Sequence, residues 1–156
     1  MKKILTSLIM LLYMTVPTSA QDIFNEVMRI QKEVETLAND TTKNLDLRKV
    51  ACFKYDAIYY LVDKASQEEL FTEYELGLQT NAMIDFVNLF VKRLGNIRKQ
   101  ADKDRLIATF RAATINNSLF NDMDKEVVYS YVDNKGFITQ FSLDTDWVKA
   151  LAEVSK

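Results

Sequence analysis

Histidine is absent from the 156 residues, and cysteine, proline and glycine are scarce. Without histidine the chain cannot form Ser-His or Cys-His nucleophile pairs, histidine acid–base groups or histidine-ligated metal sites. Carboxylates, lysines, tyrosines and hydroxyls are the groups that remain for chemistry. No cofactor motif is recognised either. We therefore expect no metal and no cofactor, and we favour a protein that is not an enzyme.

Cys52 is the only cysteine, so the chain cannot form an internal disulfide. A free cysteine usually behaves as a small apolar residue, and we interpret Cys52 in that way. Pairing between two chains is the alternative. Stability must then come from hydrophobic burial.

The N-terminus has the pattern of a secretory signal peptide. Two lysines precede an apolar run over residues 4–14, and small residues follow, ending at Ala20. The run is shorter than the roughly 20 residues that a spanning helix needs. We predict that residues 1–20 are a signal peptide cleaved between Ala20 and Gln21, and that the protein is periplasmic or extracellular. A buried N-terminal helix or a retained anchor is the alternative.

The remaining chain, residues 21–156, has the length of a single domain with a core of its own. It holds 18 basic and 22 acidic residues, a net charge of −4, and no later segment is apolar enough to span a membrane. A mildly acidic surface gives no electrostatic attraction to nucleic acid or to anionic lipid. We expect the partner to be a protein or another component of the cell envelope.

Apolar residues at helical spacing predict four helices, and the absence of proline from residues 21–156 allows them to be long. In the third predicted helix, which starts near residue 67, one side carries Leu70, Phe71, Tyr74 and Leu78. The predicted helices are residues 23–37 capped by Asp22, residues 47–65 capped by Asp46, residues 67 to about 98 started by a Ser66–Glu69 capping box, and a fourth that starts in the charged run 98–105 and frays near 116–118.

Alternating apolar residues then predict two strands, joined by a turn in which Gly136 takes the left-handed position. Pairing Val132 with Ile138 would gather Tyr129, Tyr131 and Phe141 on one buried face. A helix over residues 124–132 stays open as an alternative. The predicted fold class is mainly α: an antiparallel bundle of about four helices, with a C-terminal β-hairpin and a short terminal helix packed onto it.

Asp144 and Asp146 precede the apolar stripe of the short terminal helix. We predict that Asp144 is its N-cap and that Asp146 is an acid of its first turn, where the helix dipole favours negative charge. A calcium loop of the EF-hand type would continue with oxygen ligands, but Val148 stands at the next ligand position. The pair is therefore not expected to bind a metal.

The polar side of the second predicted helix carries the residues that we single out as a weak binding site, Tyr59, Tyr60, Asp56 and Asp63. Tyrosines off the core stripe are typical of binding surfaces. The two aspartates would be the acid–base pair if the protein were a hydrolase, although residues seven apart lie about 10 Å apart along a helix. A solvent-exposed face with tyrosines on it is the simpler interpretation.

Two further polar features interrupt apolar helix faces. Lys54 falls near the middle of an apolar side, and either its amine reaches water beyond a packed stem or it pairs with a carboxylate that the sequence does not identify. The third predicted helix carries a polar stripe that either faces solvent or, if buried, needs partners. The stripe is Asn81, Asp85, Asn88 and Lys92.

The sequence resembles no characterised family beyond its bacterial-type export signal. We favour a small exported binding or interaction module without enzymatic activity, acting in the cell envelope or outside the cell. A carboxylate-dependent hydrolase is one alternative, and a concave pocket with two carboxylates would favour it. A carrier that holds a small apolar ligand between its helices is the other, and an internal cavity would favour that.

Overall fold

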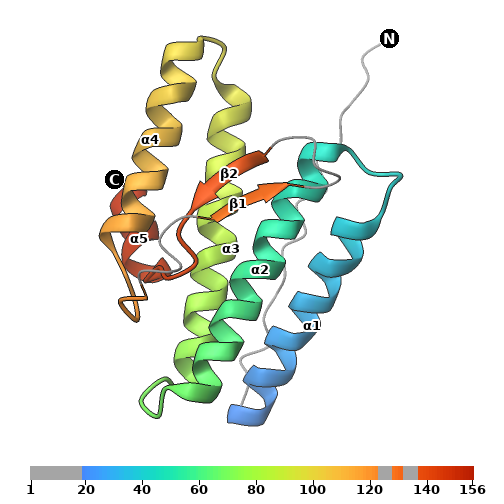
Figure 1. The fold of residues 1–156 in the computed structure, drawn as a ribbon, viewed down its shortest axis with the longest axis vertical. Helices are drawn as coiled ribbons and strands as arrows, with labels where there is room; N and C mark the ends of the chain where they lie inside the picture. Colours follow the sequence, from blue (N-terminus) through green and yellow to red (C-terminus); the bar gives the residue numbers. More distant parts are fainter. Residues whose placement is uncertain (1–18, 123–127, 132–136) are drawn as a thin grey trace.

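The computed structural model describes residues 19–122, 128–131 and 137–156 (Figure 1). This part of the chain is mainly helical. The predicted signal peptide falls almost wholly on residues 1–18, which lie outside the described residues. The described elements are α1 (Ala20–Asn39), α2 (Leu45–Gln67), α3 (Glu73–Asn96), α4 (Gln100–Asn116), β1 (Val128–Tyr131), β2 (Phe137–Phe141) and α5 (Trp147–Val154).

The first three helices begin where a polar side chain accepts a backbone hydrogen bond from the first turn. Ser19 caps α1, Asn44 caps α2, and Thr72 with Glu75 forms a capping box on α3. The predicted starts at Asp22, Asp46 and Ser66 are therefore wrong by a few residues, because a second polar residue nearby provides the cap. At Ser66 the error is largest, since α2 continues through Gln67.

Helices α1, α2 and α3 pack against one another as a three-helix layer (Figure 1). Helix α3 also packs against α4 and α5, which contact each other, while the two strands lie against α2 and β2 also contacts α4. The short sheet therefore occupies the position beside α2 that the fourth helix of a bundle would fill.

The predicted fold class is corrected by this arrangement. The first four helices do not form one antiparallel bundle. Helix α4 packs on α3 and α5, whereas α1 and α2 pack on each other and on α3. Five helices lie in the described residues, and α5 is part of the core: Trp147 and Ala150 are completely buried. The terminal helix therefore does not pack onto a finished bundle but helps to form its centre.

The predicted C-terminal hairpin is also corrected. The strand pairing does not have the register that follows from placing Val132 opposite Ile138. Two short antiparallel strands are present, with Val128 opposite Phe141 and Tyr129 opposite Gln140, one residue away from the predicted register. A further register shift follows at Ser130. The turn with Gly136, Val132 itself and most of the alternative helix 124–132 lie outside the described residues.

Aromatic rings at edge-to-face angles form the centre of the core. The ring of Phe141 lies 5.5 Å from that of Phe53, 5.3 Å from Phe86 and 5.1 Å from Phe90, and Trp147 lies 5.5 Å from Phe86. These rings come from α2, α3, β2 and α5. Within the described residues, none of the helices combines the length and the apolar character that crossing a membrane requires.

Candidate functional site

The structure places the two predicted binding tyrosines on different sides of α2. The side chain of Tyr59 is 60% exposed and stacks on Tyr55, with 6.5 Å between ring centres. Tyr60 is only 5% exposed and packs edge-to-face on Phe120. Adjacent side chains on a helix point about 100° apart. Tyr59 and Tyr60 are therefore consecutive in the sequence but do not lie together on the surface.

Asp56 and Asp63 also differ in environment. Burial raises the pKa of Asp56, which is partly buried. Asp63 is exposed, and its carboxylate accepts a hydrogen bond from Gln67 Nε2 at 2.9 Å. The hydrolase role of these aspartates stays a prediction. Cys52, one turn before Asp56, is partly buried, and burial, together with the Asp56 charge, raises the pKa of its thiol.

Tyr60 belongs to a cluster that joins α2 to the segment after α4. Its hydroxyl donates to the Asp122 carboxylate at 3.3 Å, and the Lys64 amine lies 3.4 Å from the same carboxylate. The Lys64 amine also lies above the rings of Tyr60 and Phe120, at 5.8 and 5.9 Å. Burial, and then the negative charges of Asp144 and Asp122, raise the pKa of Tyr60. The cluster is thus a contact between elements, with the phenol kept protonated.

Asp144 does not cap the terminal helix, and that prediction is wrong. Its buried carboxylate accepts backbone hydrogen bonds at 3.1 Å from Leu119, 2.7 Å from Phe120 and 2.6 Å from Asp122, and a further one from the Ser118 hydroxyl. Four donors around one carboxylate satisfy a buried charge. Asp144 therefore holds the segment after α4 against the segment before α5.

Asp146 is the N-cap of α5, accepting from the Lys149 backbone amide at 3.2 Å and from Gln79 Nε2 at 3.1 Å. Burial alone would raise the pKa of Asp146, but hydrogen bonds from Lys149 and Gln79 outweigh it and lower the pKa. Both aspartates therefore have structural partners. No group of acidic or cysteine side chains suited to a metal ion occurs in the part of the chain that the structure describes.

Lys54 and the polar stripe of α3, two separate features of the sequence, meet at the α2–α3 contact. The Lys54 amine donates to Asn88 Oδ1 at 2.7 Å. Burial lowers the pKa of Lys54 to about 8, and the charge of Asp85 opposes that effect. Lys92 is exposed, so the stripe is only partly covered. The partner of Lys54 is an amide rather than the carboxylate considered above.

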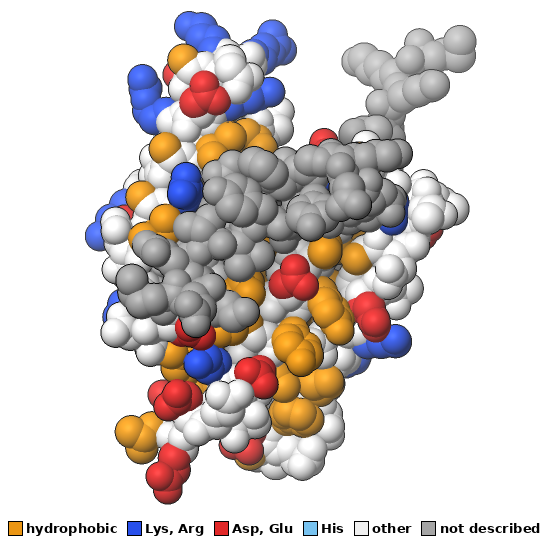
Figure 2. Space-filling model, viewed as in Figure 1, with side chains coloured by type: hydrophobic (Ala, Val, Ile, Leu, Met, Phe, Trp, Pro, Cys, Tyr) orange, Lys and Arg blue, Asp and Glu red, His pale blue; other side chains and the backbone are white. Residues whose placement is uncertain are grey.

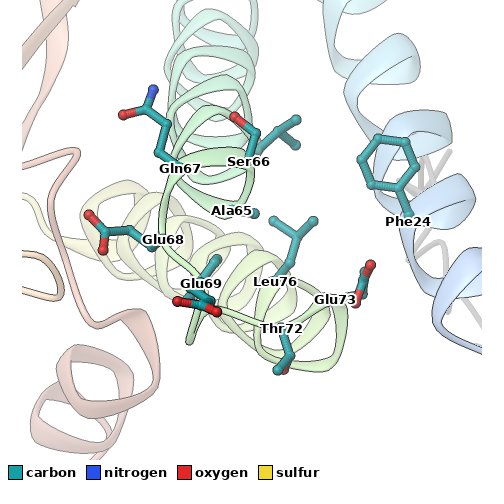
Figure 3. A pocket seen from close by; sticks show the side chains of 11 residues that line it. Phe24, Ala65, Ser66, Gln67, Glu68, Glu69, Thr72, Glu73 and Leu76 are labelled. Atoms are coloured by element: carbon teal, nitrogen blue, oxygen red, sulfur yellow. The ribbon is translucent and has the colours of Figure 1, made fainter.

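An open hollow of about 640 Å³ lies at the end of the molecule where α2 turns into α3. Figure 3 shows Phe24 of α1 across the hollow from Ala65 at the end of α2 and Leu76 at the start of α3. Val62 and Phe71 complete the apolar part of its wall. The polar residues around it are Ser66, Gln67, Glu68, Glu69, Thr72 and Glu73.

The shape of this hollow depends on a close approach of α1 to α3. A side chain on Gly77 of α3 would place its Cβ 2.8 Å from Ile23 Cγ2 of α1. Glycine therefore lets the two helices approach at this point. Phe24, the next residue of α1, is then held opposite Leu76, the residue of α3 that precedes the glycine.

Large apolar side chains lie exposed beside the hollow. Leu70 in the α2–α3 connection is 90% exposed, and Tyr74 and Leu78 on α3 are 64% and 44% exposed. In Figure 2, apolar and acidic side chains lie next to one another at this lower end of the molecule. We call the hollow together with Leu70, Tyr74 and Leu78 the α2–α3 end. Exposed apolar groups that adjoin a concave surface are typical of interaction sites.

The sequence placed Leu70, Tyr74 and Leu78 on a helix stripe with Phe71, which suggested burial. The structure differs because α3 begins at Glu73 rather than at residue 67. Leu70 then lies in the connection, and none of the described helices covers the side of α3 that carries Tyr74 and Leu78. A capping box at Thr72 and Glu75, with the spacing of the one assigned to Ser66, was the signal that could have located this helix start.

Comparisons with known proteins give no relative. No protein-family model matches the chain, and no curated protein and no solved structure matches it. The functional interpretation therefore depends on the residues and geometry described above.

Proposed function

We propose that the protein is an exported binding module without enzymatic activity, acting in the cell envelope or outside the cell, and that it contacts its partner through the α2–α3 end. The observation that carries this proposal is the exposure of Leu70, Tyr74 and Leu78 beside an apolar hollow. Complete burial of a large apolar side chain is worth about 1.5–3 kcal/mol, so each of these three residues forgoes up to that amount in proportion to its exposure. A partner that covers them would recover that free energy.

The hydroxyl groups of the hollow favour recognition over catalysis. The Ser66 hydroxyl donates to the backbone oxygen of Asp63 at 2.6 Å, and Thr72 forms the capping box of α3 with Glu75. Both hydroxyls thus complete helix ends, and the Thr72 hydroxyl donates to the Glu75 carboxylate at 3.0 Å as part of that capping box. The rest of the wall combines apolar side chains with Gln67 and the carboxylates of Glu68, Glu69 and Glu73. An apolar surface with a charged edge suits contact with a partner.

The open shape of the hollow favours a macromolecular partner over a carried small molecule. Sites for small ligands bury about 70–90% of the ligand surface. Here Ser66, Gln67 and Glu69 at the edge of the hollow are exposed, so a small ligand would stay largely in water. Leu70, which stands between the lining residues Glu69 and Phe71, adds exposed apolar surface outside the hollow.

A pull-down from envelope and secreted fractions tests the proposal, with the protein expressed from its full sequence and purified from the exported fraction as bait. The Leu70→Ser/Tyr74→Ser double variant should lose the partner that the wild type recovers. Tyr59→Ser is the matched control, because it removes an equally exposed tyrosine from the outer side of α2. If Tyr59→Ser loses the partner and the double variant keeps it, the site is the predicted α2 surface and our location is wrong.

A further inference from the structure

Three glutamates at the α2–α3 end, Glu68, Glu69 and Glu73, form no ion pair with any cation among the described residues. None of the ion pairs formed among the described residues includes any of them. The nearest lysine in the sequence, Lys64, is already paired with Asp122. The edge of the apolar hollow therefore carries negative charge that no ion pair among the described residues neutralises.

Helix capping accounts for some acidic residues here but not for all. Glu73 and Glu75 lie in the first turn of α3, where the helix dipole favours negative charge. Glu68 is the C-cap of α2 and Glu69 follows it, and carboxylates are disfavoured at that end of a helix because the dipole is negative there. Glu68 and Glu69 therefore do not stabilise the end of α2. We expect this of residues whose role is contact with a partner.

The charges of the molecule are separated along α3. Residues 63–75 contain five acidic residues and one basic residue, a net charge of −4. Residues 92–105, at the other end of α3, contain six basic and two acidic residues, a net charge of +4. Figure 2 shows Lys and Arg gathered at the upper end, where α3 meets α4. With about 36 Å between the ends of a 24-residue helix, the α2–α3 end presents a distinct negative field.

Building on the proposed function, we propose that the α2–α3 end binds a basic amphipathic helix of a partner protein. Its apolar side would cover the hollow and Leu70, and its lysines and arginines would lie against Glu68, Glu69 and Glu73. The apolar lining of the hollow comes from three helices, with Phe24 on α1, Ala65 on α2 and Leu76 on α3, so the apolar side of a bound helix can contact all three. Such grooves recognise apolar side chains at positions i, i+3, i+4 and i+7 of the bound helix.

There are two alternative occupants, and charge argues against the first of them. An anionic lipid surface would be repelled by the unpaired glutamates. A second copy of the chain would bring its basic end, residues 92–105, to the acidic end of the first. A contact of that head-to-tail kind repeats from molecule to molecule and would produce rings or open chains. A separate basic helix neutralises the rim without that consequence.

Two matched synthetic peptides test the proposal with the full-length protein. Both are 18-residue amphipathic helices with the same leucines at i, i+3, i+4 and i+7, and their polar sides carry either lysine or glutamate. Binding is measured by isothermal titration calorimetry at 50 and 500 mM salt. We expect the lysine peptide to bind, the glutamate peptide not to bind, and affinity for the lysine peptide to fall at least tenfold at the higher salt concentration.

Variants locate the contact. Glu68→Gln/Glu69→Gln/Glu73→Gln should weaken lysine-peptide binding at least tenfold, whereas Asp102→Asn/Asp104→Asn at the opposite end should leave it unchanged. Leu70→Ser/Tyr74→Ser should abolish it. All these side chains are exposed, so the variants should keep the wild-type melting temperature, which circular dichroism checks.

The proposal is overturned if the glutamate peptide binds equally well, if the triple glutamine variant binds as tightly as the wild type, or if the lysine peptide does not bind. Sedimentation that shows self-association lost in the triple variant would identify a second copy as the occupant. If the lysine peptide fails while the Leu70→Ser/Tyr74→Ser bait still loses its natural partner, only the basic-helix inference is wrong. If that bait keeps its partner as well, the proposed function fails with it.

Discussion

Lys54 of α2 and Asn88 of α3 are joined by a hydrogen bond of 2.7 Å from the amine to the amide oxygen. The amine lies within the contact between two helices, and an amide neutralises none of its charge. Burial consequently lowers its pKa to about 8, with the Asp85 charge offsetting part of the effect. The α2–α3 contact therefore contains a charged group whose removal should be favourable.

Replacing Lys54 with methionine should stabilise the protein at neutral pH and change its pH dependence. The pKa of Lys54 is about 8 in the folded chain and about 10.4 for a free lysine. Between these values the unfolded chain binds more protons, so the stability of the wild type should rise with pH there. The advantage of Lys54→Met at pH 7 should shrink by about 2 kcal/mol by pH 9.5. Urea unfolding of the wild type and of Lys54→Met at a series of pH values measures this difference in the free energy of unfolding.

Lys92→Met is the control for this experiment, because Lys92 is an exposed lysine on the same polar stripe of α3. Its stability difference from the wild type should stay constant from pH 7 to pH 9.5. A constant difference for Lys54→Met as well would show that the Lys54 amine is solvated and that its pKa is not lowered.

Asp144→Asn should destabilise the protein by about 3 kcal/mol, because an amide has one acceptor oxygen and turns its NH₂ group toward backbone donors. The carboxylate it replaces accepts from the backbone of Leu119, Phe120 and Asp122. Asp146→Asn should cost less than about 1 kcal/mol, since asparagine caps a helix about as well as aspartate. Thermal unfolding of the two variants compares them, and equal losses would contradict the role assigned to Asp144.

The two helical glycines of α3 should respond in opposite directions to alanine. Gly95→Ala should stabilise by up to about 1 kcal/mol, because a Cβ there meets nothing within 4 Å. At Gly77 a Cβ would lie 2.8 Å from Ile23 Cγ2, and the resulting overpacking, about 1–3 kcal/mol, should outweigh the helix gain. Chemical denaturation measures both changes. A stabilised Gly77→Ala variant would mean that α1 can move away from α3 at little cost.

The proposed export predicts a natural product that begins at Gln21. Ser19, which caps α1 in the full chain and accepts from the Asp22 amide at 3.2 Å, would then be removed. Intact-mass measurement of protein from the exported fraction tests this. Ala20→Phe should block cleavage, because the site requires small residues, while Gln21→Glu should not. A wild-type product that retains Met1 would contradict the signal-peptide assignment.

The sequence predicted the helical segments well and their assembly poorly. Apolar spacing indicates which segments form helices, so four long helices could be located from residues such as Val27, Ile58 and Phe90, which are all buried. The same spacing does not say which neighbour covers a stripe. The place of α4 and the burial of Trp147 depend on contacts between distant segments, and so does the register of β1 and β2.

The candidate site was only partly visible in the sequence. Lys54 and the polar stripe were both recognised, but their contact joins residues that are 34 positions apart. The role of Asp144 could not be read locally, because its donors come from residues 118–122. The α2–α3 end was missed because a shift of six residues in one helix start turns Leu70 from a helix residue into an exposed loop residue.

The position of Phe141 and Trp147 at the centre of the core has a consequence for synthesis. Both belong to the final stretch of the chain, yet they contact rings from α2 and α3, which are made much earlier. A nascent chain that lacks them has no stable interior, so it cannot fold fully before translation ends. If the chain is exported as we propose, delayed folding of this kind would keep it in an unfolded form that an export channel can accept.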